Sequence, residues 1–309
     1  MVWSCLVSVL PGMAQTEKLT DYVNPFVGTD GYGNVYPGAQ IPFGGIQISP
    51  DTDSRFYDAA SGYKYNHLTL MGFSLTHLSG TGIPDLGDFL FIPGTGEMKL
   101  EPGTHEDPDQ GYRSRYSHDK EWASPNYYAV ELADYGVKAE MTSGVRSGMF
   151  RFTYPESDNA FIMIDMNHTL WQSCEWSNLR MINDSTITGY KLVKGWGPER
   201  HVYFTATFSK KLTGLRFVQD KKPVIYNTSR FRSSYEAWGK NLMACISFDT
   251  KAGEEVTVKT AISAVSTDGA RNNMKELDGM TFNELKAKGE ALWEKELGKY
   301  TLTADRKTK

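Results

Sequence analysis

The sequence has 309 residues, of which 40% are hydrophobic and 23% charged, so the chain can bury a substantial core and its composition excludes intrinsic disorder. The net charge is −4 with both signs spread along the chain, which excludes nucleic acid binding through a basic patch. Aromatic residues make up 13% of the chain. They fit either a β-rich core or a surface that offers ring faces to the C–H groups of a sugar.

The first residues resemble the end of a secretory signal peptide. The stretch from Trp3 to Leu10 is mostly apolar, and small residues precede a cleavage position after Ala14. The basic region that normally opens such a peptide is missing, which favours a true start upstream of Met1; the alternative is a frayed N-terminus. We therefore expect residues 1–14 to be a signal peptide remnant and the protein to be exported. Elsewhere no run of about 18 apolar residues predicts a transmembrane helix.

Residues 21–266 show the alternation of apolar and polar side chains that is typical of β-strands. The pattern is clearest in two sets, namely Val202, Phe204, Ala206 and Phe208, and Val256, Val258, Thr260 and Ile262. It recurs in shorter form at Val137, Ala139 and Met141 and at Phe150 and Phe152. Turn signals such as Asp30-Gly31 and Pro93-Gly94 separate these segments. The pattern predicts a mainly β domain over residues 21–266, an antiparallel β-sandwich of two packed sheets.

Two loops near the N-terminus are candidates for binding. Residues 28–38 are glycine-rich and include Gly31, Tyr32 and Gly33, but they lack the strand-to-helix setting of a nucleotide-binding loop. They form either a set of tight turns or a place where backbone amides approach a ligand. Asp51 and Asp53 form an acidic loop that supplies too few oxygen atoms for a complete calcium site.

The segment 72–88 concentrates polar groups in a glycine-rich loop. We select from it His77, Ser79, Gly80, Thr81, Gly82, Asp85 and Asp88 as candidate binding residues. Loops on a rigid scaffold are the usual place for such groups. The alternative is structural, with His77 satisfied internally and the two carboxylates accepting hydrogen bonds from backbone amides of a turn.

Three cysteines do not form a disulfide framework. Cys5 lies in the predicted leader, so Cys174 and Cys245 are either two buried free thiols, which we favour, or one pair. No serine-hydrolase elbow, zinc-protease motif or zinc-spaced cluster of cysteine and histidine occurs.

Near the C-terminus the pattern becomes helical. Thr281 and Glu284 form a capping box, and Leu285, Leu292, Trp293 and Leu297 share one stripe before Gly298. We expect one amphipathic linker helix within residues 267–309, after an irregular stretch from Asp268 to Gly279. Its stripe either packs back on the sandwich or, as we favour, begins a further domain.

Several motifs together resemble glycoside hydrolase family 92. They are Val23-Asn-Pro-Phe-Val-Gly-Thr29, Tyr36-Pro-Gly-Ala39, Ile41-Pro-Phe-Gly44, Ser49-Pro-Asp-Thr52, Gly72-Phe-Ser74, Thr76-His-Leu-Ser-Gly-Thr-Gly82, Asp85-Leu-Gly-Asp88, Ala123-Ser-Pro125, Asp134-Tyr-Gly136, Gly195-Trp196 and Val202-Tyr-Phe204. The resemblance runs from about Asp21 to the last helix. The sequence departs from it at Tyr32, Asn34 and Leu75, where histidine is common, and at Gly45, where a larger residue is usual.

This resemblance implies an N-terminal sandwich joined by helices to an (α/α)₆ barrel, in an inverting, calcium-dependent exo-α-mannosidase that trims N-glycans and mannans. In the family the catalytic carboxylates and most calcium contacts belong to the barrel, so we assign no catalytic residue and no metal ligand here. The sandwich is expected to supply one wall of the sugar pocket. The partners implied are α-mannoside glycans and the helical domain, in a periplasmic or cell-surface bacterial protein.

Two alternatives remain open at this point. The chain is either a stand-alone carbohydrate-binding module, or part of another N-glycan enzyme such as an amidase that releases the intact glycan.

Overall fold

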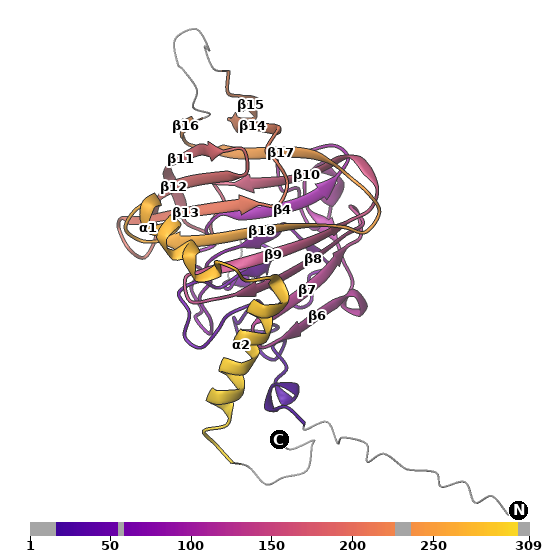
Figure 1. The fold of residues 1–309 in the computed structure, drawn as a ribbon, viewed down its shortest axis with the longest axis vertical. Coiled ribbons are helices and arrows are strands. Elements are labelled where there is room, and N and C mark those ends of the chain that lie inside the picture. The colour runs from indigo at the N-terminus through magenta and orange to yellow at the C-terminus, as the bar shows by residue number, and fades with distance from the viewer. Residues whose placement is uncertain (1–16, 55–58, 226–235, 302–309) are drawn as a thin grey trace, which may run out of the picture.

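The computed structural model describes residues 17–54, 59–225 and 236–301. The predicted signal peptide remnant, residues 1–14, lies outside the described residues. The described part is a sandwich of two large antiparallel sheets with helices at its C-terminal end (Figure 1). The predicted fold class is therefore confirmed.

The first sheet has seven strands. In spatial order they are β1 (Ser49–Asp51), β3 (Gly72–Ser74), β4 (Leu90–Thr95), β10 (Ser157–Asp165), β17 (Leu242–Thr250), β14 (Gly214–Gln219) and β15 (Lys222–Pro223). The central strands β4, β10 and β17 are buried on both faces. Accordingly, residues 160–164 on β10 form a continuous apolar run instead of an alternation.

The second sheet has nine strands. In spatial order they are β16 (Glu236–Gly239), β11 (Ser173–Asn183), β12 (Thr186–Lys194), β13 (Arg200–Phe208), β18 (Glu254–Ser263), β9 (Ser147–Tyr154), β8 (Val137–Ser143), β7 (Tyr127–Leu132) and β6 (Glu121–Ser124). A small third sheet pairs β2 (Thr69–Leu70) with β5 (Ser114–Arg115). Short 3-10 turns lie at Leu19–Tyr22, Pro108–Gln110, His118–Lys120 and Lys275–Leu277.

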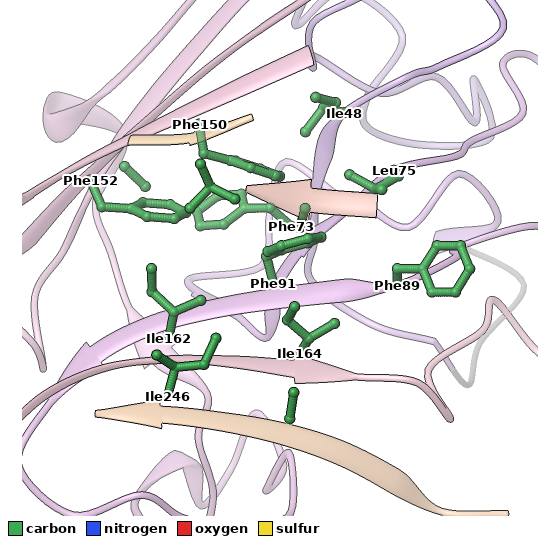
Figure 2. Packing of buried hydrophobic residues seen from close by; sticks show 14 of the residues in the cluster. Ile48, Phe73, Leu75, Phe89, Phe91, Phe150, Phe152, Ile162, Ile164 and Ile246 are labelled. Atoms are coloured by element: carbon green, nitrogen blue, oxygen red, sulfur yellow. The ribbon is translucent and has the colours of Figure 1, made fainter. Parts of the chain in front are cut away.

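The main core lies between the two large sheets. Figure 2 shows the rings of Phe73, Phe91 and Phe150 meeting there, with Ile162 and Ile246 beside them. The ring centroids of Phe91 and Phe150 are 4.9 Å apart. The inward residues of β13 and β18 are those that the alternation selected, and all are buried. Period-2 patterning therefore located the buried face of these strands correctly.

Two helices follow the last strand. The helix α2 (Phe282–Leu297) begins at the predicted capping box, in which Thr281 Oγ1 accepts from the Glu284 amide and the Glu284 carboxylate accepts from the Thr281 amide. The helix α1 (Thr267–Met274) occupies part of the stretch that we expected to be irregular, so that expectation is wrong. Ser266 caps α1 by accepting from the Gly269 amide, a local signal that apolar periodicity does not register in so short a helix.

The first half of α2 packs back on the sandwich. Phe282 and Leu285 are buried in a small cluster with Met149 and Leu277. Farther along, Leu292 and Leu297 are only partly buried, whereas Trp293 donates from its indole nitrogen to the Gln40 carbonyl at 2.7 Å. The predicted stripe thus divides between contact with the sandwich and exposure to solvent.

Candidate functional site

The two loops selected from the sequence lie against each other. The amide of Gly80 donates to the carbonyl oxygen of Asn34 at 2.7 Å, and the hydroxyl of Ser61 donates to the same oxygen. Within the first loop Gly33 is packed so closely that a Cβ atom there would lie 2.2 Å from the carbonyl oxygen of Gly28. A side chain cannot be accommodated at that position, which is the physical reason for glycine there.

A buried carboxylate ties the second loop to two other segments. Asp51, at the end of β1, is fully buried, and its two oxygens lie 2.8 Å from Nε2 of His77 and 2.8 Å from Nε2 of His168. Nδ1 of His77 is 2.8 Å from the Gln47 carbonyl oxygen. Burial by itself would raise the pKa of Asp51, but the His77 charge and the hydrogen bond from His168 outweigh it and hold that pKa below its usual range.

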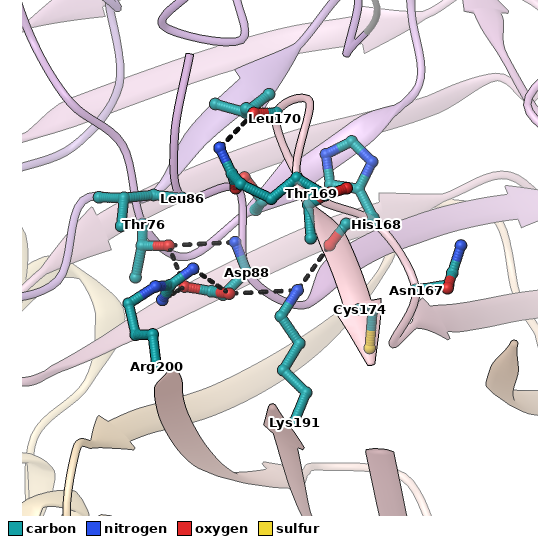
Figure 3. Close-up of polar contacts among 12 residues, drawn as sticks. Thr76, Leu86, Asp88, Asn167, His168, Thr169, Leu170, Cys174, Lys191 and Arg200 are labelled. Carbon is teal, nitrogen blue, oxygen red and sulfur yellow. Dashed lines mark hydrogen bonds and ion pairs between the residues drawn. The ribbon is translucent and has the colours of Figure 1, made fainter. Parts of the chain in front are cut away.

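A second buried carboxylate bridges the two sheets. Asp88, just before β4, lies 3.1 Å from the ammonium of Lys191 on β12 and 2.6 Å from the guanidinium of Arg200 on β13. Figure 3 shows these side chains converging, with Thr76 donating to the same carboxylate at 2.7 Å. Burial alone would raise the pKa of Asp88, yet the two cations lower it below the usual range. Lys191 also donates to the His168 carbonyl at 2.6 Å, which connects this ion pair to the Asp51 cluster.

The other carboxylate of the second loop, Asp85, has backbone partners. Asp85 accepts from the amide of the next residue, Leu86, at 2.6 Å and from the amide of Trp196 at 3.2 Å. The first contact is a hydrogen bond from a backbone amide, the kind of contact that the structural alternative expected of both Asp85 and Asp88. The second contact brings a third loop to the site, and the side chain of Trp196 is 65% exposed there.

The predicted site residues divide into a buried and an exposed set. Asp51, His77, Asp85 and Asp88 are buried and have partners inside the protein. Gly31, Tyr32, Gly33, Ser79, Gly80 and Gly82 are exposed, and Thr81 is partly exposed. The exposed residues can contact a ligand directly, while the buried ones act by fixing the loop conformation.

Sequence reasoning missed the segment from Asp165 to Cys174, which joins β10 to β11. It lines an open groove of about 970 Å³ together with Tyr112, Lys240 and Asn241. Gln172 connects the groove to the second loop, because its side-chain amide donates to the Pro84 carbonyl at 2.9 Å. The signal available in the sequence was a run of polar residues directly after an apolar strand, which is where binding groups commonly lie.

Neither buried carboxylate is placed to bind calcium. The oxygens of Asp51 and Asp88 are taken by histidine, lysine and arginine side chains, and Asp53 lies 3.2 Å from Nε2 of His105. Within residues 17–54, 59–225 and 236–301 no group of three or more histidine, cysteine, aspartate or glutamate residues is arranged for a metal ion. Calcium takes six to eight oxygen ligands, so the carboxylates of this site do not fit that ion. Cys174 and Cys245 are both buried free thiols.

Comparisons with known proteins agree on one family. A model described as the glycosyl hydrolase family 92 N-terminal domain matches residues 22–263. The solved family 92 α-mannosidase from Bacteroides thetaiotaomicron in complex with mannoimidazole is 99% identical and superposes with a TM-score of 0.92, over 94% of this chain and 38% of that one. The solved family 92 glycosyl hydrolase ccman5 is 26% identical with a TM-score of 0.78, over 93% of this chain and 38% of that one.

A curated relative from Arthroderma benhamiae is described as a secreted glycosidase. It is 26% identical over 308 residues, which cover 91% of this chain and 38% of the relative. The chain therefore spans well under half the length of the relatives that it matches. Among the described residues, no helix is both long and apolar enough to cross a membrane.

Proposed function

The chain belongs to glycoside hydrolase family 92, and on that basis we propose that it is the N-terminal domain of an inverting exo-α-mannosidase that acts on N-glycans or mannans. In this proposal residues 21–266 form one wall of the sugar pocket. Residues 267–309 lead toward a helical (α/α)₆ barrel that carries the catalytic carboxylates. The observation that carries the proposal is the match to the family's N-terminal domain, over only 38% of the length of the longer relative.

The electrostatics of the buried carboxylates support placing catalysis elsewhere. An inverting glycosidase needs a protonated acid with a raised pKa and a base about 6.5–9.5 Å away that activates water. Asp51 and Asp88 instead have lowered pKa values, Asp51 beside two histidines and Asp88 beside Lys191 and Arg200. Neither is therefore suited to donate a proton to a leaving sugar, and neither has a free face toward solvent.

The same contacts of the buried carboxylates suit a wall that must be rigid. They hold the two ends of the loop at His77 and Asp88, while the tip between them stays exposed. We propose that the hydroxyls of Ser79 and Thr81 and the backbone near Gly80 and Gly82 bind sugar hydroxyls, with Gly31, Tyr32 and Gly33 beside them. Loops fixed in advance lose less entropy when a ligand binds.

Three further features belong to the complete protein in this proposal. Calcium is held mostly by the barrel, in keeping with Asp51 and Asp88, whose oxygens are already paired with other side chains. The barrel and α-mannoside glycans are the partners. A relative described as a secreted glycosidase supports export. We propose the periplasm or surface of a bacterium as the destination.

We expect the 309-residue chain to release no free mannose from α-1,2-, α-1,3- or α-1,6-linked mannobiose, with calcium or with chelator. The longer Bacteroides thetaiotaomicron relative is expected to release mannose and serves as the positive control. Free mannose is measured by chromatography with a sensitive detector. Chelator-sensitive release by this chain alone would show that a complete catalytic site lies within it and would overturn the proposal.

The wall itself is tested in the longer relative. Alanine at the positions that correspond to Ser79 and Thr81 is expected to lower kcat/KM about tenfold each, because each change removes a hydrogen bond worth about 1.4 kcal/mol. The matched control is Thr213→Ala, at an exposed threonine outside these loops, which is expected to leave kcat/KM unchanged. Unchanged kcat/KM in the loop variants would place the wall elsewhere, without affecting the family assignment.

A further inference from the structure

The nine-stranded sheet has an outer face that its helices cover only in part. The helix α1 lies over β18 and β13, and α2 lies over β8 and β9 (Figure 1). On β12, β11 and β16, at one edge of this sheet and beyond the main contacts of α1, large side chains point outward. Trp238 on the edge strand β16 is 54% exposed and Trp176 on β11 is 46% exposed. A face built of tryptophan and left half in water is uncommon outside interaction sites.

The strand register places the aromatic residues of this face side by side. Trp238 is opposite Asn178, which is opposite Tyr190, which is opposite Tyr203, so one row crosses four strands. In the next row Trp176 is opposite Leu192. Trp176 and Trp238 are diagonal neighbours on adjacent strands, which are typically about 7–8 Å apart. We call Trp176, Tyr190, Leu192, Tyr203 and Trp238 the aromatic face.

Internal contacts hold part of the aromatic face in place. The ring centroids of Tyr190 and Tyr203 are 4.9 Å apart, and Tyr190 Oη lies 3.1 Å from Nδ1 of His201. Asn178, between the two exposed tryptophans, donates to the Glu236 carboxylate at 3.2 Å. The aromatic face is therefore ordered before a ligand binds, and polar atoms lie among its rings.

The charges around the aromatic face balance one another. Arg180 is opposite Glu236 in the register, and Lys240 lies 3.1 Å from Glu175. Glu199 lies 2.8 Å from His201, and Lys194 adds one more positive charge next to Glu175. Three glutamates and three lysine or arginine side chains thus surround the rings, with His201 beside Glu199, so these carboxylates and cations cancel and do not favour an anionic polymer or membrane. A partner that complements the aromatic face is therefore uncharged.

We propose that the aromatic face binds neutral oligosaccharide or polysaccharide chains, as an ancillary carbohydrate site separate from the loop wall. Tryptophan rings stack on the apolar C–H faces of pyranoses, and the partly exposed Glu236 carboxylate beside them can accept a hydrogen bond from a sugar hydroxyl. Such a site would hold a long glycan near the enzyme and would not take part in bond cleavage. It goes beyond the proposed function and does not depend on which sugar enters the pocket.

The test is retention of the 309-residue chain in native gels containing soluble yeast mannan. We expect the double variant Trp176→Ala with Trp238→Ala to lose at least tenfold in apparent affinity, while Trp176→Tyr with Trp238→Tyr keeps most of it. The matched control is Trp122→Ala, which removes a 44% exposed tryptophan from β6 at the opposite edge of the same sheet. Circular dichroism confirms that each variant is folded.

Each outcome bears on the proposal. The proposal is supported if mannan retains the alanine double variant less than the wild type, the tyrosine double variant and the Trp122→Ala control. It also requires that the anionic polymer heparin retains none of these proteins. Equal retention of wild type and double variant, or no retention of the wild type, overturns it. If sedimentation shows a wild-type dimer that the double variant dissociates, and mannan does not compete, the face is a contact between copies and the proposal is also overturned. Failure of the mannosidase proposal would show as absent mannose release from the longer relative, independently of these gels.

Discussion

Replacing Asp88 with asparagine is expected to lower the free energy of unfolding by about 3–5 kcal/mol, because breaking a buried ion pair leaves the remaining charge uncompensated. The side chains of Asp88 and Lys191 are both completely buried. Lys191 would keep its hydrogen bond to the His168 carbonyl but would lose its counter-charge. Arg200 is partly exposed, so it can turn toward water and accounts for less of the loss.

Urea unfolding at pH 7, followed by circular dichroism, measures the effect. The matched control is Asp184→Asn, because Asp184 forms an exposed pair with Lys211 at 3.6 Å and such pairs contribute about 0–1 kcal/mol. If the two variants lose similar free energy of unfolding, the buried ion pair stabilises the fold no more than the exposed pair does. A further variant, Asp88→Asn with Lys191→Met, is expected to recover part of the stability, because it removes the unpaired ammonium.

The second large effect concerns Asp51 and acid pH. We expect Asp51→Asn to cost about 3 kcal/mol at neutral pH, because it weakens two hydrogen bonds to a charged group that are worth about 1.5–3 kcal/mol each. The pKa of Asp51 is lower in the folded protein than in the unfolded chain. The folded state therefore binds fewer protons, and this contribution to stability is complete above about pH 5.

The contribution disappears as the pH falls below about 4, toward the lowered pKa of the folded state. The wild type is therefore expected to lose stability between pH 5 and 3 more steeply than Asp51→Asn, which has no carboxylate to protonate at that position. Urea midpoints at four pH values in this range measure the two slopes. Parallel slopes would show that Asp51 titrates alike in the folded and unfolded states, contrary to its pairing with His77 and His168.

Much of the fold could be predicted because its signals are local. The alternation at Val202 to Phe208 located an inward face, and the pair Thr281 and Glu284 located the start of α2. The helix α1 was missed because eight residues are too few for a clear apolar stripe. The groove at residues 165–174 was missed because it is formed by segments far apart in the sequence.

The site could be predicted only in outline. The candidate loops were selected from glycine and polar composition, and in the structure the Gly80 amide donates to the Asn34 carbonyl. The different contacts of their carboxylates could not be predicted, since Asp85 accepts from two backbone amides whereas Asp88 pairs with two cations. The spacing of Asp85 and Asp88 in the sequence does not distinguish a carboxylate bound by backbone amides from one paired with cations. Only the surroundings of each residue in the folded chain do so.

By itself, the sequence determined the β-rich class, the inward faces of the clearest strands, the capped final helix and the family motifs. Each of these depends on residues a few positions apart, where backbone periodicity and turn chemistry act. Only the tertiary structure decided that Asp51 meets His168, 117 positions away, and that Asp88 meets Lys191. It also decided that Trp176 and Trp238 share one face, because strand order and register bring distant residues together and no local pattern encodes them.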